Sequence, residues 1–138
     1  MKQFIILVLV VFNYAFAKAQ NTTSKQVEAP FIGLKLMNGE MADFGDTQVK
    51  FVEVLSDSRC PKDVTCVWAG EAKVRVEIYQ NGELSEAKEL TFGGLTKSLN
   101  IIHSELLDVQ ALKLQPYPLS SSDKKSMEYY LVLDVQEH

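Results

Sequence analysis

The chain has 138 residues with 14 basic and 18 acidic side chains, for a formal net charge of −4. Without residues 1–19, which carry two lysines and no acid, the charge falls to −6. This balance argues against binding to nucleic acid or to anionic membrane surfaces, because both favour basic patches. The 119 residues from Gln20 onward suffice for one domain with one hydrophobic core.

The N-terminus has the pattern of a secretory signal peptide. Lys2 precedes an unbroken apolar run from Phe4 to Phe12, and Ala17-Lys18-Ala19 offers the small-x-small pattern that signal peptidase recognises. The apolar run is too short to span a bilayer, which needs about 20 residues. We therefore expect residues 1–19 to be cleaved and a mature protein, periplasmic or secreted, that begins at Gln20 without membrane insertion. An uncleaved anchor is the alternative.

Residues 20–30 are polar at their start and end in a proline, which predicts a flexible tail before a single domain over residues 31–138. In that domain apolar residues recur with a period of two, which is typical of half-buried strands. Asn81-Gly82 is a strong hairpin signal. The pattern predicts an all-β protein, an antiparallel β-sandwich or barrel of about seven to eight strands. The strands are expected over residues 31–36, 41–44, 49–55, 73–78, 83–92, 97–102, 111–115 and 129–135.

The segment Ser98–Leu107 fits two kinds of secondary structure. Its apolar residues recur at helical spacing, as Leu99, Ile102 and Leu106 do, and also in alternation. A short apolar run cannot be assigned by periodicity alone. We favour a strand up to about Ile102 and then a turn or a helical piece up to Asp108.

The only two cysteines and the only tryptophan lie within one segment, Asp57 to Gly70. Five residues separate Cys60 from Cys66, a spacing that suits a short loop closed by a disulfide, and an exported protein would keep that bond oxidised. In the chain-entropy model such a closure stabilises by on the order of 2 kcal/mol. Reactive or metal-bound thiols are the alternative, but they usually need closer cysteine pairs or further ligands. We therefore expect a structural disulfide, with no metal and no cofactor.

Two runs in this segment, Asp57-Ser58-Arg59-Cys60-Pro61 and Cys66-Val67-Trp68-Ala69-Gly70-Glu71-Ala72, carry a resemblance. They resemble a family of small exported bacterial proteins, often from Bacteroidota-type bacteria, that share a DSRCP-x4-C-x-W-x-G core and have no established function. The resemblance extends to Val49–Leu55, Leu114–Pro118 and Tyr129–Val135, and so covers most of the chain after the signal segment. It implies an all-β exported domain and no activity.

One interpretation of the motif is a structural brace. Arg59 lies near Asp57 and Glu71 in the sequence. Its guanidinium could bridge the two carboxylates and stack on the indole of Trp68. The disulfide, the ion pair and Trp68, followed by Gly70, would then plug one end of the sandwich.

The other interpretation is a binding loop with a charged tip, Lys62-Asp63, and clamped ends. A pre-organised loop loses little entropy on binding. Such a loop would suit a partner such as an envelope or secreted protein. A buried Trp68 and Arg59 would favour the brace, whereas an exposed loop beside a concave apolar patch would favour binding. The candidate binding loop consists of Pro61, Lys62, Asp63, Val64 and Thr65.

Catalysis has little support in the sequence. His103-Ser104-Glu105 has the residue types of a hydrolase triad, but sequence neighbours usually point in different directions. The other histidine, His138, is the last residue. We expect an exported, non-catalytic binding or scaffold domain of the bacterial envelope. The alternatives are a purely structural accessory domain without a discrete ligand, and a hydrolase that uses His103.

Overall fold

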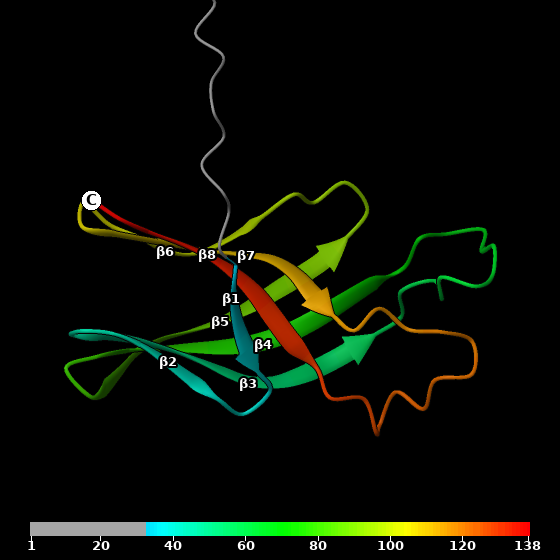
Figure 1. Ribbon diagram of the computed structural model, residues 1–138, viewed down its shortest axis with the longest axis horizontal. Coiled ribbons are helices and arrows are strands. Elements are labelled where there is room, and N and C mark those ends of the chain that lie inside the picture. The colour runs from blue at the N-terminus through cyan, green and yellow to red at the C-terminus, as the bar shows by residue number, and fades with distance from the viewer. Residues whose placement is uncertain (1–32) are drawn as a thin grey trace, which may run out of the picture. The chain divides into compact units, whose positions relative to one another are not determined.

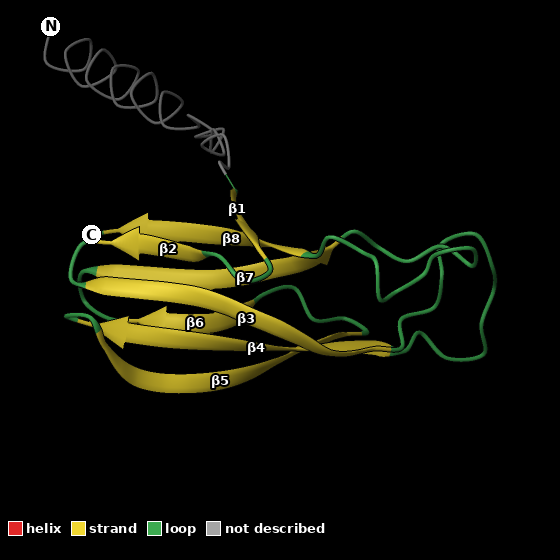
Figure 2. Ribbon diagram, turned by 90° about the horizontal axis from the view of Figure 1, so that it is seen from below, coloured by secondary structure: helices red, strands yellow, loops and turns green. Residues whose placement is uncertain are grey.

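The computed structural model describes residues 33–138, which form eight strands and no helix (Figure 2). The predicted all-β antiparallel architecture with one disulfide is confirmed. Within these residues, no helical segment has the length and apolar character needed to cross a membrane. The predicted signal peptide over residues 1–19 and the tail over residues 20–30 lie outside the described residues.

The strands form two four-stranded sheets around one core (Figure 1). Of the two predicted architectures, a sandwich or a barrel, the protein therefore adopts the sandwich. All neighbouring strands are antiparallel. Sheet A has the order β1 (Leu34–Met37), β8 (Tyr130–Glu137), β7 (Leu107–Gln115) and β6 (Leu99–His103). Sheet B has the order β2 (Met41–Phe44), β3 (Thr47–Asp57), β4 (Glu71–Gln80) and β5 (Glu83–Gly93).

Strand β4 shows how the sequence pattern builds the core. Val74, Val76 and Ile78 are buried, and the charged residues between them point outward. They pack with buried residues of both sheets, including Phe51 and Leu131. Burying an aliphatic or aromatic side chain of this size stabilises by about 1.5–3 kcal/mol. The core face predicted from the period of two is therefore confirmed for this strand.

The segment Ser98–Leu107 forms no helix. Strand β6 ends at His103, and a tight turn follows in which the backbone N–H and hydroxyl of Ser104 both donate to the carbonyl of Leu107. The proposed helical piece is wrong, and β7 begins at Leu107 rather than Ala111. Pairing with β8 sets the start of β7, because it places Leu107 and Val109 in the core. The local apolar pattern of a short segment does not contain this information.

Most connections lie at the two ends of the sandwich. The turns between β2 and β3, between β4 and β5, and between β6 and β7 lie at one end, which we call the hairpin end (Figure 1). The β4–β5 turn contains Asn81-Gly82, where both residues have positive φ as the predicted hairpin requires. The long connections, residues 58–70 and 116–129, extend from the opposite end (Figures 1 and 2). We call this opposite end the loop end. It contains the whole cysteine–tryptophan motif.

Candidate functional site at the loop end

Arg59 is the buried charged centre of the loop end. It lies two residues after Asp57, the last residue of β3, and is only 5% exposed. Its Nε donates to Asp57 Oδ1 at 2.8 Å and its Nη2 to Oδ2 at 2.6 Å, while the Asp57 side chain is 3% exposed. This two-point contact between a guanidinium and a carboxylate is the strongest kind of protein ion pair.

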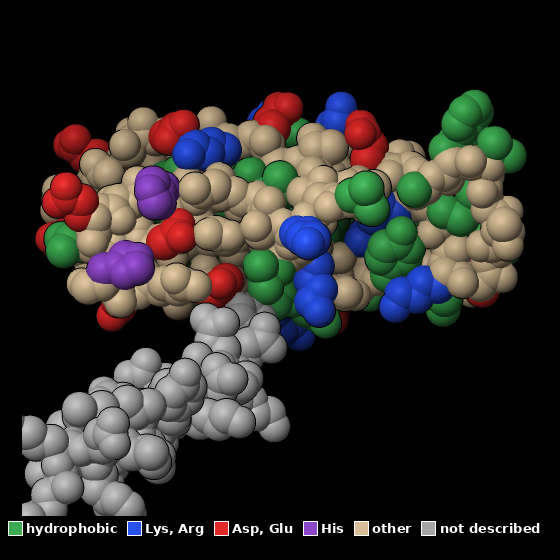
Figure 3. Space-filling model, turned by 90° about the horizontal axis from the view of Figure 1, so that it is seen from above, with side chains coloured by type: hydrophobic (Ala, Val, Ile, Leu, Met, Phe, Trp, Pro, Cys, Tyr) green, Lys and Arg blue, Asp and Glu red, His purple; other side chains and the backbone are tan. Residues whose placement is uncertain are grey.

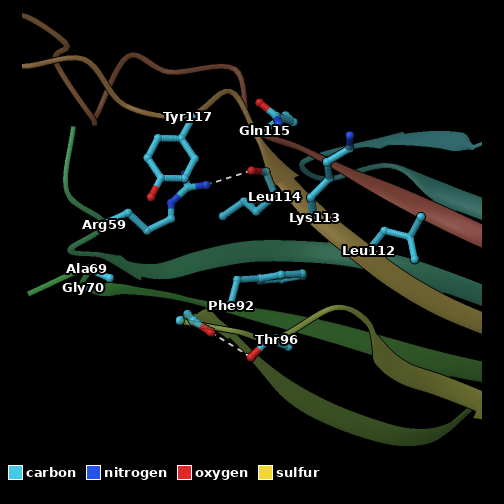
Figure 4. Close-up of a pocket in the computed structure, with 12 residues that line it drawn as sticks. Arg59, Ala69, Gly70, Phe92, Thr96, Leu112, Lys113, Leu114, Gln115 and Tyr117 are labelled. Carbon is cyan, nitrogen blue, oxygen red and sulfur yellow. Dashed lines mark hydrogen bonds between the residues drawn. The ribbon is translucent and has the colours of Figure 1, made fainter. Parts of the chain in front are cut away.

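The remaining contacts of Arg59 tie sheet B to sheet A. The guanidinium also donates to the carbonyl oxygens of Leu114 at 2.8 Å and Pro116 at 3.1 Å, and it lies 4.6 Å from the ring centre of Tyr117 (Figure 4). Tyr129, beside β8, donates its hydroxyl to Asp57 Oδ2 at 3.0 Å. These bonds compensate the burial of two charges. We call Asp57, Arg59, Tyr117 and Tyr129 the Arg59 cluster.

The ionisation of the cluster follows from these contacts. Burial alone would raise the pKa of Asp57. The hydrogen bonds and charge of Arg59, together with the hydrogen bond from the Tyr129 hydroxyl, outweigh burial and hold the pKa of Asp57 below its usual 3.8. The stability that Asp57 contributes is therefore present above about pH 4 and lost as the pH falls through the lowered pKa. Burial and the bond to Asp57 raise the pKa of Tyr129 to about 12.

Gly70 allows the loop to close against the end of β3. The backbone N–H of Ser58 donates to the carbonyl of Glu71, and that of Cys60 to the carbonyl of Ala69, both at 2.8 Å. Gly70 has φ +69°, and a Cβ at this position would lie 1.9 Å from the backbone oxygen of Ser58. Only glycine fits both the conformation and the space, which explains the glycine of the motif.

The loop itself is fastened at several points. Cys60 and Cys66 are bonded, with their Cα atoms 5.9 Å apart, which confirms the predicted disulfide. The backbone N–H of Lys62 donates to the carbonyl of Pro118. Asp63 accepts hydrogen bonds from the backbone N–H and the hydroxyl of Ser120, and these bonds lower the pKa of Asp63. The predicted tip is thus exposed, but its carboxylate is held by the facing loop.

The apolar side chains of the motif point outward. Trp68 is 81% exposed, Val67 is 89% exposed and Val64 is 46% exposed. We call Val64, Val67 and Trp68 the apolar loop face. Hydrophobic side chains gather at this end of the surface in Figure 3. The brace interpretation, in which Trp68 helps to plug one end of the sandwich, is therefore wrong for this residue.

The expected partners of Arg59 also need correction. Its stacking partner is Tyr117, whose ring centre lies 4.6 Å from the guanidinium, while Trp68 is 81% exposed. Glu71 pairs with Lys73 at 3.2 Å and makes no ion pair with Arg59. Sequence spacing could not identify Tyr117 and Tyr129. Two signals pointed to them: Tyr117 lies between two prolines at the end of a predicted strand, and the family resemblance extends to Leu114–Pro118 and Tyr129–Val135.

A concave site lies beside the exposed loop. A cavity of about 300 Å³ opens between Ala69 and Gly70 of the loop, Phe92 at the end of β5, and the last residues of β7 (Figure 4). This volume is at the small end of the range for ligand sites. The two criteria that were to separate a brace from a binding loop therefore each hold in part. Arg59 is buried, as expected of a brace, while the loop is exposed beside a concave patch, as expected of a binding site.

The histidine considered for catalysis lies at the hairpin end. The His103 side chain is 76% exposed, with Nδ1 3.6 Å from Asp108 Oδ1. The Ser104 hydroxyl donates to the carbonyl of Leu107 and accepts from its N–H, so it stabilises the turn. Glu105 is exposed in the same turn. Within residues 33–138, no three potential metal ligands gather.

Comparisons with known proteins supply no template for this site. No protein-family model, curated protein or solved structure matches the chain. The functional argument therefore rests on the geometry of the loop end.

Proposed function

We propose that this protein is an exported bacterial domain that binds an envelope or secreted protein through the apolar loop face. The Arg59 cluster would position the loop, and the exposed side chains would make the contact. The domain would act by binding rather than by catalysis. This proposal moves the contact from the charged tip, Lys62-Asp63, to the neighbouring apolar residues.

The observation that carries the proposal is an exposed tryptophan on a constrained loop. A Trp68 that is 81% exposed next to a Val67 that is 89% exposed adds nothing to the core and costs solubility. Tryptophan is among the residues most enriched at the energetic centres of protein interfaces. The disulfide and the Asp63–Ser120 bonds limit the loop's freedom before binding, which reduces the entropy lost on association.

The export part of the proposal rests on two features. Residues 1–19 have the charge, the apolar run and the cleavage pattern of a signal peptide. The Cys60–Cys66 bond is compatible with an oxidising compartment, where such bonds persist. The family resemblance of the motif agrees with the same location.

Site-specific photo-crosslinking in cells tests the proposal. A photo-reactive phenylalanine analogue replaces Val67 in the full-length chain, and adducts are identified by mass spectrometry. The matched control carries the analogue at Leu84, which is 55% exposed at the hairpin end. We expect a discrete protein adduct from position 67 that is absent from position 84. The second substitution Trp68→Ala should abolish the adduct, because it removes the largest exposed contact surface.

Three outcomes would contradict the proposal. Equal adducts from both positions would indicate non-specific proximity. No adduct at position 67 would assign the loop a purely structural role. A discrete adduct that persists unchanged with Trp68→Ala would show that Trp68 does not carry the contact.

A further inference from the structure

The Arg59 guanidinium keeps one N–H group after its bonds to the described residues are counted. A guanidinium carries five N–H groups. Within residues 33–138, four of them have an acceptor: two on the Asp57 carboxylate and one each on the carbonyls of Leu114 and Pro116. The fifth is on Nη1, which has two N–H groups and donates among these residues only to Leu114. We call it the spare N–H of Arg59. Because Arg59 is 5% exposed, this donor is buried, and a buried donor without an acceptor costs free energy.

The cavity beside the loop, about 300 Å³ in volume, adjoins the spare N–H. Arg59 and Leu114 both line the cavity, and the hydrogen bond from Nη1 to the Leu114 carbonyl, 2.8 Å long, joins these two walls. Figure 4 shows the guanidinium extending toward Leu114, with Phe92 below them in the view. The nitrogen with the spare N–H therefore lies at the boundary of the cavity, where an oxygen atom bound inside can accept from it.

The rest of the cavity wall is mainly apolar. Phe92, at the end of β5, is 8% exposed, and Leu112 and Tyr117 are half-buried. The hydroxyl of Thr96, on the opposite wall, already donates to the carbonyl of Gly93 at 2.8 Å. Aromatic rings that pack against one another contribute more than the area they bury. These walls favour a ligand with a flat apolar body.

Charge decides which kind of acceptor fits. The Arg59 charge is paired with Asp57 at 2.6 Å, so the buried pair carries no net charge. Among the described residues, the one other charged side chain at the cavity is the exposed Lys113, which extends away from Phe92 in Figure 4. A carboxylate in the cavity would lose its hydration without an uncompensated positive charge to replace it. A neutral oxygen costs less to bury, provided that it accepts a hydrogen bond.

Size and chemistry together indicate a phenol group. An apolar cavity of about 150 Å³ is large enough to hold benzene, so a cavity of about 300 Å³ has room for a substituted ring. Tyrosine is the only side chain that combines an aromatic ring with an oxygen acceptor. It is also among the residues most enriched at the energetic centres of protein interfaces.

We propose that the cavity binds a tyrosine side chain of the protein that contacts the apolar loop face. The phenol ring packs against Phe92 and Tyr117, and its oxygen accepts the spare N–H of Arg59. Ala69, which lines the cavity, directly follows Trp68, so one partner can reach both surfaces. Because the cavity opens to solvent, water can accept the phenol's own hydrogen. This inference rests on the proposed binding function of the loop end and names the residue type by which the partner is held.

A titration with tyrosine and phenylalanine derivatives tests the chemistry. N-Acetyl-tyrosine amide is added to isotope-labelled, disulfide-bonded protein and followed by NMR. We expect saturable shifts at Phe92 and Leu114, with intermolecular nuclear Overhauser effects between the probe ring and both side chains. N-Acetyl-phenylalanine amide lacks the acceptor and should bind at least about fivefold more weakly, because one hydrogen bond is lost. The 4-carboxyphenylalanine derivative should also bind more weakly than the tyrosine derivative, because its carboxylate is charged.

A pair of variants in one turn locates the site independently. Thr96→Trp places an indole at the wall of the cavity, and Leu95→Trp places the same bulk at a neighbouring residue that is 98% exposed and does not line it. We expect Thr96→Trp to abolish the shifts at Phe92 and Leu114, and Leu95→Trp to leave them unchanged. Equal binding of the phenylalanine derivative or tighter binding of the carboxylate would overturn the inference. So would unchanged binding to Thr96→Trp, or no saturable binding at Phe92 and Leu114.

The photo-crosslink at position 67 distinguishes a tyrosine of the partner from a free phenol. Thr96→Trp should weaken the Val67 adduct in cells, because the partner loses its anchoring side chain, whereas Leu95→Trp should not. An adduct unaffected by Thr96→Trp would mean that the cavity does not take a side chain of the partner, and would overturn the inference. The proposed function would then still stand, because the apolar loop face alone would hold the partner. No adduct at position 67 in the wild-type chain would contradict the proposed function itself.

Discussion

The Arg59 cluster and the apolar loop face belong to the same short segment but have opposite burial. In the cluster an arginine is 5% exposed, whereas in the loop face a tryptophan is 81% exposed. Hydrophobicity alone would place them the other way round. The difference indicates that the cluster holds the loop end together and that the loop face is free for contact. Variants that separate stability from binding test this division.

The largest expected effect is at Arg59. Arg59→Met leaves the Asp57 carboxylate buried without its charged partner, and we expect a loss of about 3–5 kcal/mol in the free energy of unfolding. Denaturant titration measures this loss. The matched control is Arg75→Met, because Arg75 pairs with Glu53 on the exposed face of β4 and should change stability by no more than about 0.5 kcal/mol. Equal effects of the two substitutions would show that the cluster is not a brace.

A slightly smaller effect is expected at Gly70. Gly70→Ala adds a Cβ that would lie 1.9 Å from the Ser58 backbone oxygen, at a positive φ, and should cost about 2–4 kcal/mol. Gly82→Ala provides the control, because Gly82 has φ +82° with no atom within 4 Å of the added Cβ, and should cost about 1 kcal/mol. Thermal unfolding of the two variants measures the difference. A Gly70→Ala variant as stable as Gly82→Ala would contradict the close approach of the loop to β3.

The hydroxyl of Tyr129 should have a smaller effect that depends on pH. Tyr129→Phe removes the hydrogen bond to Asp57 and should cost about 1.5 kcal/mol at neutral pH. The pKa of Tyr129 is raised to about 12 in the folded state, so its contribution is fully present below about pH 10 and is lost as the pH rises to 12. Stability curves of the two proteins should therefore converge over that range. Parallel curves would show that the hydroxyl is not bonded to a carboxylate.

Much of the fold could be predicted because its strands are locally encoded. Val74, Val76 and Ile78 alternate with charged residues, and Asn81-Gly82 fixes the turn that follows. The segment Ser98–Leu107 could not be assigned, because β6 is fixed by pairing with β7 and the start of β7 at Leu107 by pairing with β8, which lies far along the chain. Local periodicity carries no information about such a partner.

The site was predictable in its location but not in its arrangement. The disulfide and the Asp57–Arg59 pair involve residues close in sequence, and both were expected. Tyr117 and Tyr129 reach the cluster from the two ends of the other long connection, residues 116–129, more than fifty residues away in the sequence. Tyr117 takes the position against Arg59 that the sequence suggested for Trp68, and only the tertiary structure reveals this.

The free energy of unfolding of Trp68→Ala tests the central claim most directly. Because the indole is 81% exposed, we expect a change within about 0.5 kcal/mol, measured by denaturant titration of the disulfide-bonded protein. Phe51→Ala, at a fully buried position, is the reference and should cost about 3–5 kcal/mol. A Trp68→Ala variant with the stability of the wild type would leave the indole free to serve binding. A loss of about 3 kcal/mol or more would mean that Trp68 belongs to the core, and would contradict the division between the Arg59 cluster and the apolar loop face.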